Sequence, residues 1–366
     1  MGGCRAGGTP VDLSPMRARP PVGGRTMRPQ VMLLIGLVAL LCAPALALGG
    51  PLARALDHLA SQQDPHGGGF AQGAGTERSY TAWAALAVSA AGGRPERWSR
   101  GGASLRDALT RPLRGASLGE MERVAVAISA AGLDPRTAAG TNIVRRVLMA
   151  QGADGAIGRD VSTTGWGILA LRASGLGPDS RAVVGARGAL ERAQRADGGW
   201  STDDGVPRSA PNTTAEAVQA LVAAGRDAGA SGSLRRARAF LLAAQNPDGG
   251  FPAVVGGEST ALTTAWVALS IRALDERSSR PPWNRSGGPL AFLKRMQRPD
   301  GGVRNAAASR LASTWATSQA ALAFAGRPLP LRAGAPAATR RSPAPDGDLL
   351  DAVLAAFGLR RDPTGR

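Results

Sequence analysis

Glu216 occupies a position that tryptophan holds in two neighbouring stretches of the sequence. Stretches beginning at residues 163, 213 and 263 read Thr-Thr-Gly-Trp, Thr-Thr-Ala-Glu and Thr-Thr-Ala-Trp. The shared pattern places Glu216 on a helical face that is expected to point into the interior of the fold. A buried carboxyl group there would have a raised pKa and could donate a proton or hold a cationic ligand group. The alternative interpretation is a partly solvated glutamate paired with one of the many arginines.

Four tryptophans accompany this acid in alanine-rich helical segments: Trp83, Trp166, Trp266 and Trp315. They predict an apolar cavity that binds an apolar ligand and stabilises cations, with Asn212 and Thr213 beside it. The alternative is that the rings only pack between helices. Other acids near the expected cavity ends should mostly be loop or capping residues, because carboxylates favour helix starts. These acids are Glu77, Glu120, Glu122, Asp160, Asp203, Asp204 and Glu258.

The composition excludes several classes of chemistry. The chain has two cysteines and two histidines, so no metal site built from a Cys/His cluster is expected, and no cofactor is expected either. The net charge is +17, yet Lys294 is the only lysine and no nucleic-acid-binding motif accompanies the arginines. We therefore expect no nucleic-acid partner. Arginines gather in the segments expected to form outer helices, which would suit an anionic cell-envelope surface.

The N-terminal extension, residues 1–47, has the pattern of a secretory signal. Arg25 and Arg28 precede a twelve-residue apolar run at 31–42, and Ala-Leu-Ala follows at 45–47. Twelve apolar residues are too few to span a bilayer, which takes about 20. The sequence therefore predicts an exported protein, secreted or envelope-associated, with cleavage near Ala47. Cleavage there would remove both cysteines.

A short turn sequence repeats through the rest of the chain and is called here the glutamine turn. It begins at Gln151, Gln194, Gln245 and Gln297, and a variant with one extra glycine begins at Gln63. An apolar run with helical spacing precedes each turn, and a second helix rich in Ala and Leu follows. The spacing predicts one further glutamine turn at residues 105–119, but the turn sequence is missing there. The residues of the three best-preserved turns are Gln194, Gly198, Trp200, Gln245, Gly249, Phe251, Gln297 and Gly301.

The repeat predicts an all-α domain at 51–326 made of six helical hairpins. Five of the second helices run into a glycine suited to a left-handed C-cap. We expect these helices to have about 16 residues and a height of roughly 24 Å at 1.5 Å per residue, with strands nowhere. After the domain, 327–345 reads as a Pro/Ala/Arg linker and 346–366 as a short helix and tail that caps the domain.

The pattern Gln194-x-x-x-Gly198-x-Trp200 resembles the QW motif of squalene and oxidosqualene cyclases. The degenerate copies resemble those of the wider terpenoid cyclase/protein prenyltransferase superfamily. This resemblance implies an α/α toroid, in which the second helices form an inner ring around a central cavity and the motif ties neighbouring outer helices together.

The resemblance also implies where a cyclase would carry its acid. Class II terpenoid cyclases have a DxDD or DCTAE motif whose Asp protonates the polyene. The similar stretch here is Asn212-Thr213-Thr214-Ala215-Glu216, and Asp160 keeps only the first acid of DxDD. An amide cannot deliver a proton to an alkene. The zinc chemistry of prenyltransferases needs a cysteine, which the mature chain lacks.

Three hypotheses for function follow. The first is an exported toroid that binds an apolar, isoprenoid-like molecule in its central cavity without classical catalysis. The second is an isoprenoid cyclase, an isomerase in which Glu216 or Asp160 replaces the missing acid. The third is a cell-envelope scaffold that uses only its basic outer surface.

Overall fold

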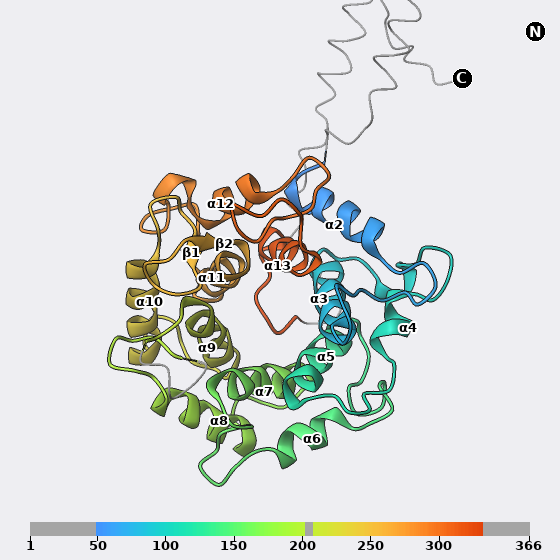
Figure 1. Ribbon diagram of the computed structural model, residues 1–366. Coiled ribbons are helices and arrows are strands. Elements are labelled where there is room, and N and C mark those ends of the chain that lie inside the picture. The colour runs from blue at the N-terminus through green and yellow to red at the C-terminus, as the bar shows by residue number, and fades with distance from the viewer. Residues whose placement is uncertain (1–48, 202–207, 332–366) are drawn as a thin grey trace, which may run out of the picture. The chain divides into compact units, whose positions relative to one another are not determined.

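The computed structural model describes residues 49–201 and 208–331. The expected signal segment, the C-terminal helix and all of the expected linker except 327–331 lie outside these residues. Six inner helices follow one another around a ring (Figure 1): α3 (Glu77–Ala90), α5 (Leu118–Ala130), α7 (Val161–Ala173), α9 (Pro211–Ala223), α11 (Ala261–Ala273) and α13 (Thr314–Ala325). Six outer helices alternate with them: α2 (Pro51–Gln62), α4 (Leu105–Leu109), α6 (Ile143–Met149), α8 (Arg181–Arg192), α10 (Gly232–Ala244) and α12 (Gly288–Met296).

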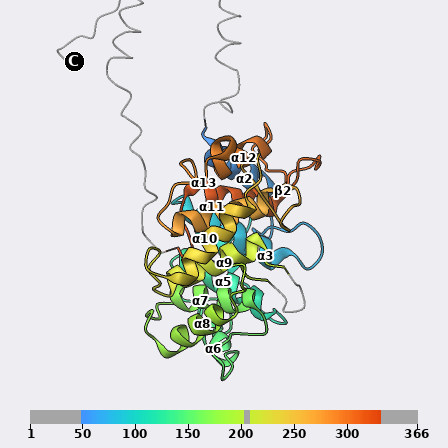
Figure 2. The same ribbon diagram turned by 90° about the vertical axis from the view of Figure 1, so that its left-hand side faces the viewer.

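The ring is closed. Each inner helix packs against the next one along the chain, and the last, α13, packs against both α3 and α2. Figure 2 shows the same ring from its edge. The expectation of an all-α toroid with an inner and an outer layer is confirmed, and an open superhelix is excluded for the described residues.

The inner helices are shorter than expected. They have 12 to 14 residues instead of about 16, a height of about 20 Å. Side-chain caps set the starts of α5, α7 and α11: Ser117, Asp160 and Thr260 each accept a hydrogen bond from a backbone N–H of the first turn. The expectation of no strands was also wrong, because β1 (Phe251–Pro252) pairs antiparallel with β2 (Ser259–Thr260). Two 3₁₀ segments, η2 (Pro95–Arg97) and η3 (Arg285–Gly287), lie in the connections.

Glycine follows the C-cap of four inner helices and is itself the C-cap of the fifth, α13. Gly92, Gly132, Gly175, Gly225 and Gly326 have φ between 64° and 91°, and Asp275 takes the equivalent place after α11 with φ 58°. A left-handed residue at this point ends the helix and turns the chain towards the next outer helix.

Each glutamine turn joins two successive hairpins through its side-chain amide. The Nε2 group of Gln194 donates to the carbonyl of Gly198 within its own turn (2.8 Å) and to that of Ser233 on the next outer helix (2.9 Å). The other four glutamine turns repeat this pair of bonds, one local and one to the following outer segment. The last residue of each turn donates its backbone N–H to a threonine hydroxyl on the following inner helix.

The turn glycine is required by close packing as well as by its conformation. Gly301 has φ 85°, and a Cβ atom there would lie 2.0 Å from the carbonyl oxygen of Arg54. Gly198 has φ 88°, and its Cβ would lie 2.6 Å from the carbonyl oxygen of Arg236. The backbone of each turn therefore rests directly on the next outer helix.

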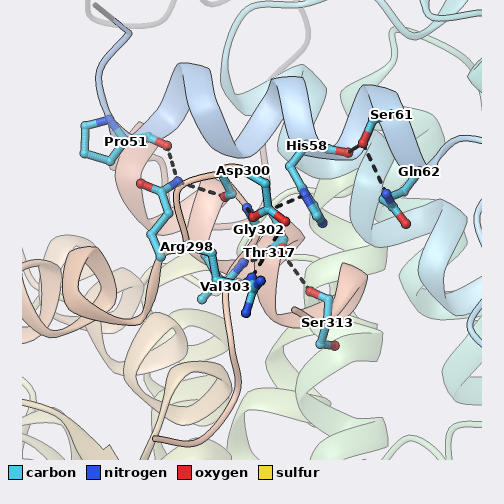
Figure 3. Close-up of polar contacts among 12 residues, drawn as sticks. Pro51, His58, Ser61, Gln62, Arg298, Asp300, Gly302, Val303, Ser313 and Thr317 are labelled. Carbon is cyan, nitrogen blue, oxygen red and sulfur yellow. Dashed lines mark hydrogen bonds and ion pairs between the residues drawn. The ribbon is translucent and has the colours of Figure 1, made fainter. Parts of the chain in front are cut away.

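The seam between the last and first hairpins uses the same bonds. Gln297 donates to the carbonyls of Pro51 (2.9 Å) and Gly301 (3.0 Å), and it accepts from the Arg54 guanidinium (2.8 Å). Figure 3 shows the last turn lying beneath α2, with Asp300 facing His58 at 3.8 Å. The ring therefore closes by joining residues about 246 positions apart.

Several arginines of the outer layer bind the preceding turn, two of them on outer helices and Arg285 on η3. Arg192 donates to the carbonyl of Asp154, Arg285 to that of Gln245 and Arg295 to that of Asp248. Part of the positive charge of the outer layer is thus used to hold adjacent hairpins together.

Candidate functional site: an axial pocket

One residue from each inner helix lines a single pocket on the ring axis. These six residues are Trp83, Arg123, Trp166, Glu216, Trp266 and Gln319. One helical turn earlier, Ser79, Asn212, Leu262 and Trp315 line the same pocket, because residues four apart share a helix face. Asn212, Leu262 and Trp315 are each the second residue of their helix, so the pocket lies at the end of the ring where the inner helices begin. This cavity of about 320 Å³ is called here the axial pocket.

Three of the tryptophans meet on the axis as a mutually packed cluster. The ring centroids of Trp83, Trp166 and Trp266 are 5.4, 5.5 and 5.6 Å apart, and the ring planes cross at 81° to 88°. Edge-to-face contact of this kind is favourable for aromatic rings. All three side chains are buried. The tryptophans therefore fill the middle of the ring, and the axial pocket lies at one end of it.

The chain itself occupies part of the opposite end. After Gly326 the chain turns back towards the ring centre (Figure 1), where Leu329 and Leu331 are buried. The backbone N–H of Leu329 donates to Oε1 of Gln219 on α9 (3.1 Å). Residues 327–331, expected as the start of a linker, are thus packed against the inner ring.

Glu216 lies in the axial pocket beside the tryptophan cluster and is partly exposed. Its Oε2 accepts a hydrogen bond from the Ser162 hydroxyl at 2.8 Å. Burial raises the pKa of Glu216 to about 7, although the Ser162 bond and the positive charge of Arg123 oppose this change. Near neutral pH the carboxyl group can therefore carry a proton, which an ordinary glutamate does not.

Arg123 is the one basic residue that lines the axial pocket among the described residues. Its guanidinium carbon lies 5.8 Å from the centroid of the Trp166 ring, a cation–π arrangement. It makes no hydrogen bond and no ion pair within the described part of the chain. The sequence does not single out Arg123, because the glutamine turn before α5 is missing and the repeat spacing therefore does not extend to this helix.

The other predicted site residues lie in different surroundings. Asn212 lines the axial pocket, and Trp315 stands at its edge, 38% exposed and 5.8 Å from the Tyr80 ring. Thr213 is fully buried and does not line the pocket. Asp160 caps α7 by accepting from the backbone N–H of Thr163 (2.7 Å), and it does not line the axial pocket.

Neither a metal cluster nor a membrane-spanning helix occurs in 49–201 and 208–331. No group of three His, Cys, Asp or Glu side chains there is placed to hold a metal ion. No helix in these ranges is both long and apolar enough to cross a bilayer.

Comparison with known structures identifies the architecture. No protein-family model matches the sequence. A type II terpene cyclase from Scytonema, solved with its product merosterolic acid A, superposes with a TM-score of 0.50 and 16% identity, over 75% of this chain and 95% of that one. The chain has the terpene cyclase fold.

Two further relatives match over part of their length. A drimenyl diphosphate synthase from Streptantibioticus cattleyicolor is 34% identical over 128 residues, which is 35% of this chain and 22% of the synthase. The ent-copalyl diphosphate synthase from Streptomyces platensis superposes with a TM-score of 0.47 and 20% identity, over 68% of this chain. This chain covers 50% of the copalyl synthase.

Proposed function

We propose that the axial pocket binds an apolar, isoprenoid-type molecule without proton-initiated cyclisation. The observation that carries the proposal is the cluster of Trp83, Trp166 and Trp266, which gives the pocket an aromatic floor. Leu262 and Trp315 add apolar wall. Aromatic rings offer large contact areas to an apolar chain.

The volume of the axial pocket limits the size of the enclosed part of the ligand. At roughly 30 Å³ per water-sized group, about 320 Å³ holds about ten non-hydrogen atoms. That corresponds to about two five-carbon isoprene units. A longer polyprenoid would leave the rest of its chain outside, because the tryptophan cluster blocks the axis below.

Asn212 argues against cyclisation by the usual acid. It lines the axial pocket from the first turn of α9, the place where the resemblance to cyclases implies an aspartic acid. A carboxamide has no proton acidic enough to transfer to an alkene. Binding is thus the activity that the pocket residues support.

Calorimetric titration with geraniol, a ten-carbon isoprenoid, tests the proposal. Saturable binding by the wild type is expected, with a loss of at least tenfold in Leu262→Asp, which places a charge in the pocket wall. Leu311→Asp is the matched control, because Leu311 is 79% exposed and does not line the pocket. Equal weakening by both variants, or no binding by the wild type, would contradict the proposal.

A second candidate function, isoprenoid cyclisation, is favoured by one observation, the position of Glu216 inside the axial pocket. Its carboxyl would transfer a proton to an alkene carbon, a neighbouring double bond would close the ring, and loss of a proton from carbon would restore the acid. Mass spectrometry after incubation with a linear polyprenoid tests this function. A cyclic product that disappears in Glu216→Gln would establish it, whereas retained ligand without product supports binding alone.

We also propose, from the sequence alone, that the protein is exported and that it contacts an anionic envelope surface. The apolar run at 31–42 supports export, and the excess of arginine supports attraction to an anionic surface. Detection of the protein in culture medium or envelope fractions would test both.

A further inference from the structure

Arg123 is an unpaired cation within an otherwise mostly neutral pocket. Five N–H groups of a guanidinium are hydrogen-bond donors, and none of them has an acceptor in the described residues. The planar group is held beside the Trp166 ring, which orients it without neutralising it. A partly buried arginine in this state is suited to a ligand that brings its own negative charge.

The surroundings of the axial pocket add to this preference. All six inner helices begin around it, so the positive ends of their dipoles converge on its mouth. Trp83, whose side chain is buried in the pocket lining, has an indole N–H without an acceptor. The pocket thus offers unused donors together with positive charge.

We propose that the ligand of the axial pocket is an amphiphile whose anionic head, a carboxylate or a phosphate, binds Arg123 while its isoprenoid chain lies on the tryptophan cluster. This inference rests on the proposed function and specifies its ligand. It assigns Arg123 as the residue that selects an acid over the corresponding alcohol or hydrocarbon. Bidentate bonds from the guanidinium to two oxygens supply that selectivity.

Glu216 should make the binding of the anionic head group in the axial pocket depend on pH. The charged groups that act on Glu216 are Arg123 from α5 and Asp160 at the start of α7, and no other charged side chain lines the pocket among the described residues. An ionised Glu216 repels an anionic head, whereas a protonated one can donate a hydrogen bond to it. Since the pKa of Glu216 is about 7, binding should weaken as the pH rises from 6.5 to 8.5.

Three ligands with the same ten-carbon chain test the inference by calorimetry: geraniol, geranic acid and geranyl monophosphate. We expect at least tenfold tighter binding of geranic acid or of the phosphate than of geraniol, and the better of the two identifies the head as carboxylate or phosphate. Arg123→Gln should reduce the acids to the affinity of geraniol. Arg146→Gln, an exposed arginine on an outer helix, makes the same change in net charge and should leave the preference intact.

The possible outcomes separate this inference from the proposed function. Binding of geraniol as tight as that of both acids would overturn the inference and leave the proposed function standing. Failure of all three ligands to bind would overturn both. If Arg123→Gln does not fold, Arg123→Met keeps an unbranched side chain without the charge, and an unchanged preference in that variant would also overturn the inference. Geranic acid is ionised throughout pH 6.5–8.5, so its affinity should fall with pH in the wild type but not in Glu216→Gln.

Discussion

Glu122 is a buried acid without a partner, and its replacement should make the protein more stable. Glu122 is 0% exposed, and neither carboxyl oxygen has a hydrogen bond in the structure. It precedes Arg123 on α5, and the equivalent place on the other inner helices holds a small residue. Those residues are Ala82, Gly165, Ala215, Ala265 and Ser318. Burial raises the pKa of Glu122 well above its ordinary value of 4.5, and the charge of Arg123 only partly opposes this effect.

The raised pKa determines how stability changes with pH. Between pH 4.5 and the folded-state pKa, the folded protein holds a proton on Glu122 that the unfolded chain has released. Glu122 therefore does not lower the free energy of unfolding below pH 4.5. Above pH 4.5 the free energy of unfolding falls by about 1.4 kcal/mol per pH unit, until the folded-state pKa is reached. Glu122→Gln removes this loss, because a carboxamide of similar shape carries no charge to bury.

Urea unfolding followed by circular dichroism at pH 5, 6, 7 and 8 measures the effect. The difference in unfolding free energy between Glu122→Gln and the wild type should grow with pH and favour the variant. Glu120→Gln is the matched control on the same helix: Glu120 forms a capping box with Ser117, its pKa is lowered, and its loss should reduce stability by about 1 kcal/mol. A Glu122→Gln variant that is less stable than the wild type at every pH, with an unchanged pH slope, would refute the reasoning.

Three other predictions follow from the fold, the site and the sequence. Gln297→Leu at the seam and Gln194→Leu within the ring each remove two partly buried donations, so each should lower the free energy of unfolding by about 2 to 3 kcal/mol in urea. A difference between the two variants above about 1 kcal/mol would contradict the equivalence of the two junctions. Glu216→Gln should remove a loss of roughly 3 kcal/mol that the wild type shows between pH 4.5 and 7, because its pKa rises from 4.5 to about 7. Intact-mass measurement of protein secreted by the native host should show a chain that begins near residue 48, and full-length protein that retains Cys42 would contradict export.

The ring could be predicted from the sequence because its construction is repetitive. Glycine at positive φ, a glutamine four or five residues before it and apolar helical runs on both sides are local features, and each is visible in the residue types. Helix lengths were overestimated, because capping by Ser117 or Asp160 depends on backbone geometry that residue type only suggests.

The axial pocket could be predicted only in part. Trp166, Glu216 and Trp266 share a spacing, so their common position on the ring axis follows from the repeat. The pairing of their rings with Trp83 depends on tertiary packing, and so does the filling of the ring centre. Arg123 could not be predicted, because the glutamine turn before α5 is missing and arginine is abundant in the sequence. Only its place beside Trp166 distinguishes it from the other arginines.

The seam at Gln297 has a consequence for how such a chain can be cut and rejoined. The bonds that close the ring have the same form as those between consecutive hairpins, with one amide donating to its own turn and to the next outer helix. The hydrogen bonds that join α2 to the preceding turn are therefore of the same kind as those of the other outer helices. A circularly permuted gene that begins at any other outer helix, with a linker long enough to join the present ends, should encode a ring with the same set of junctions.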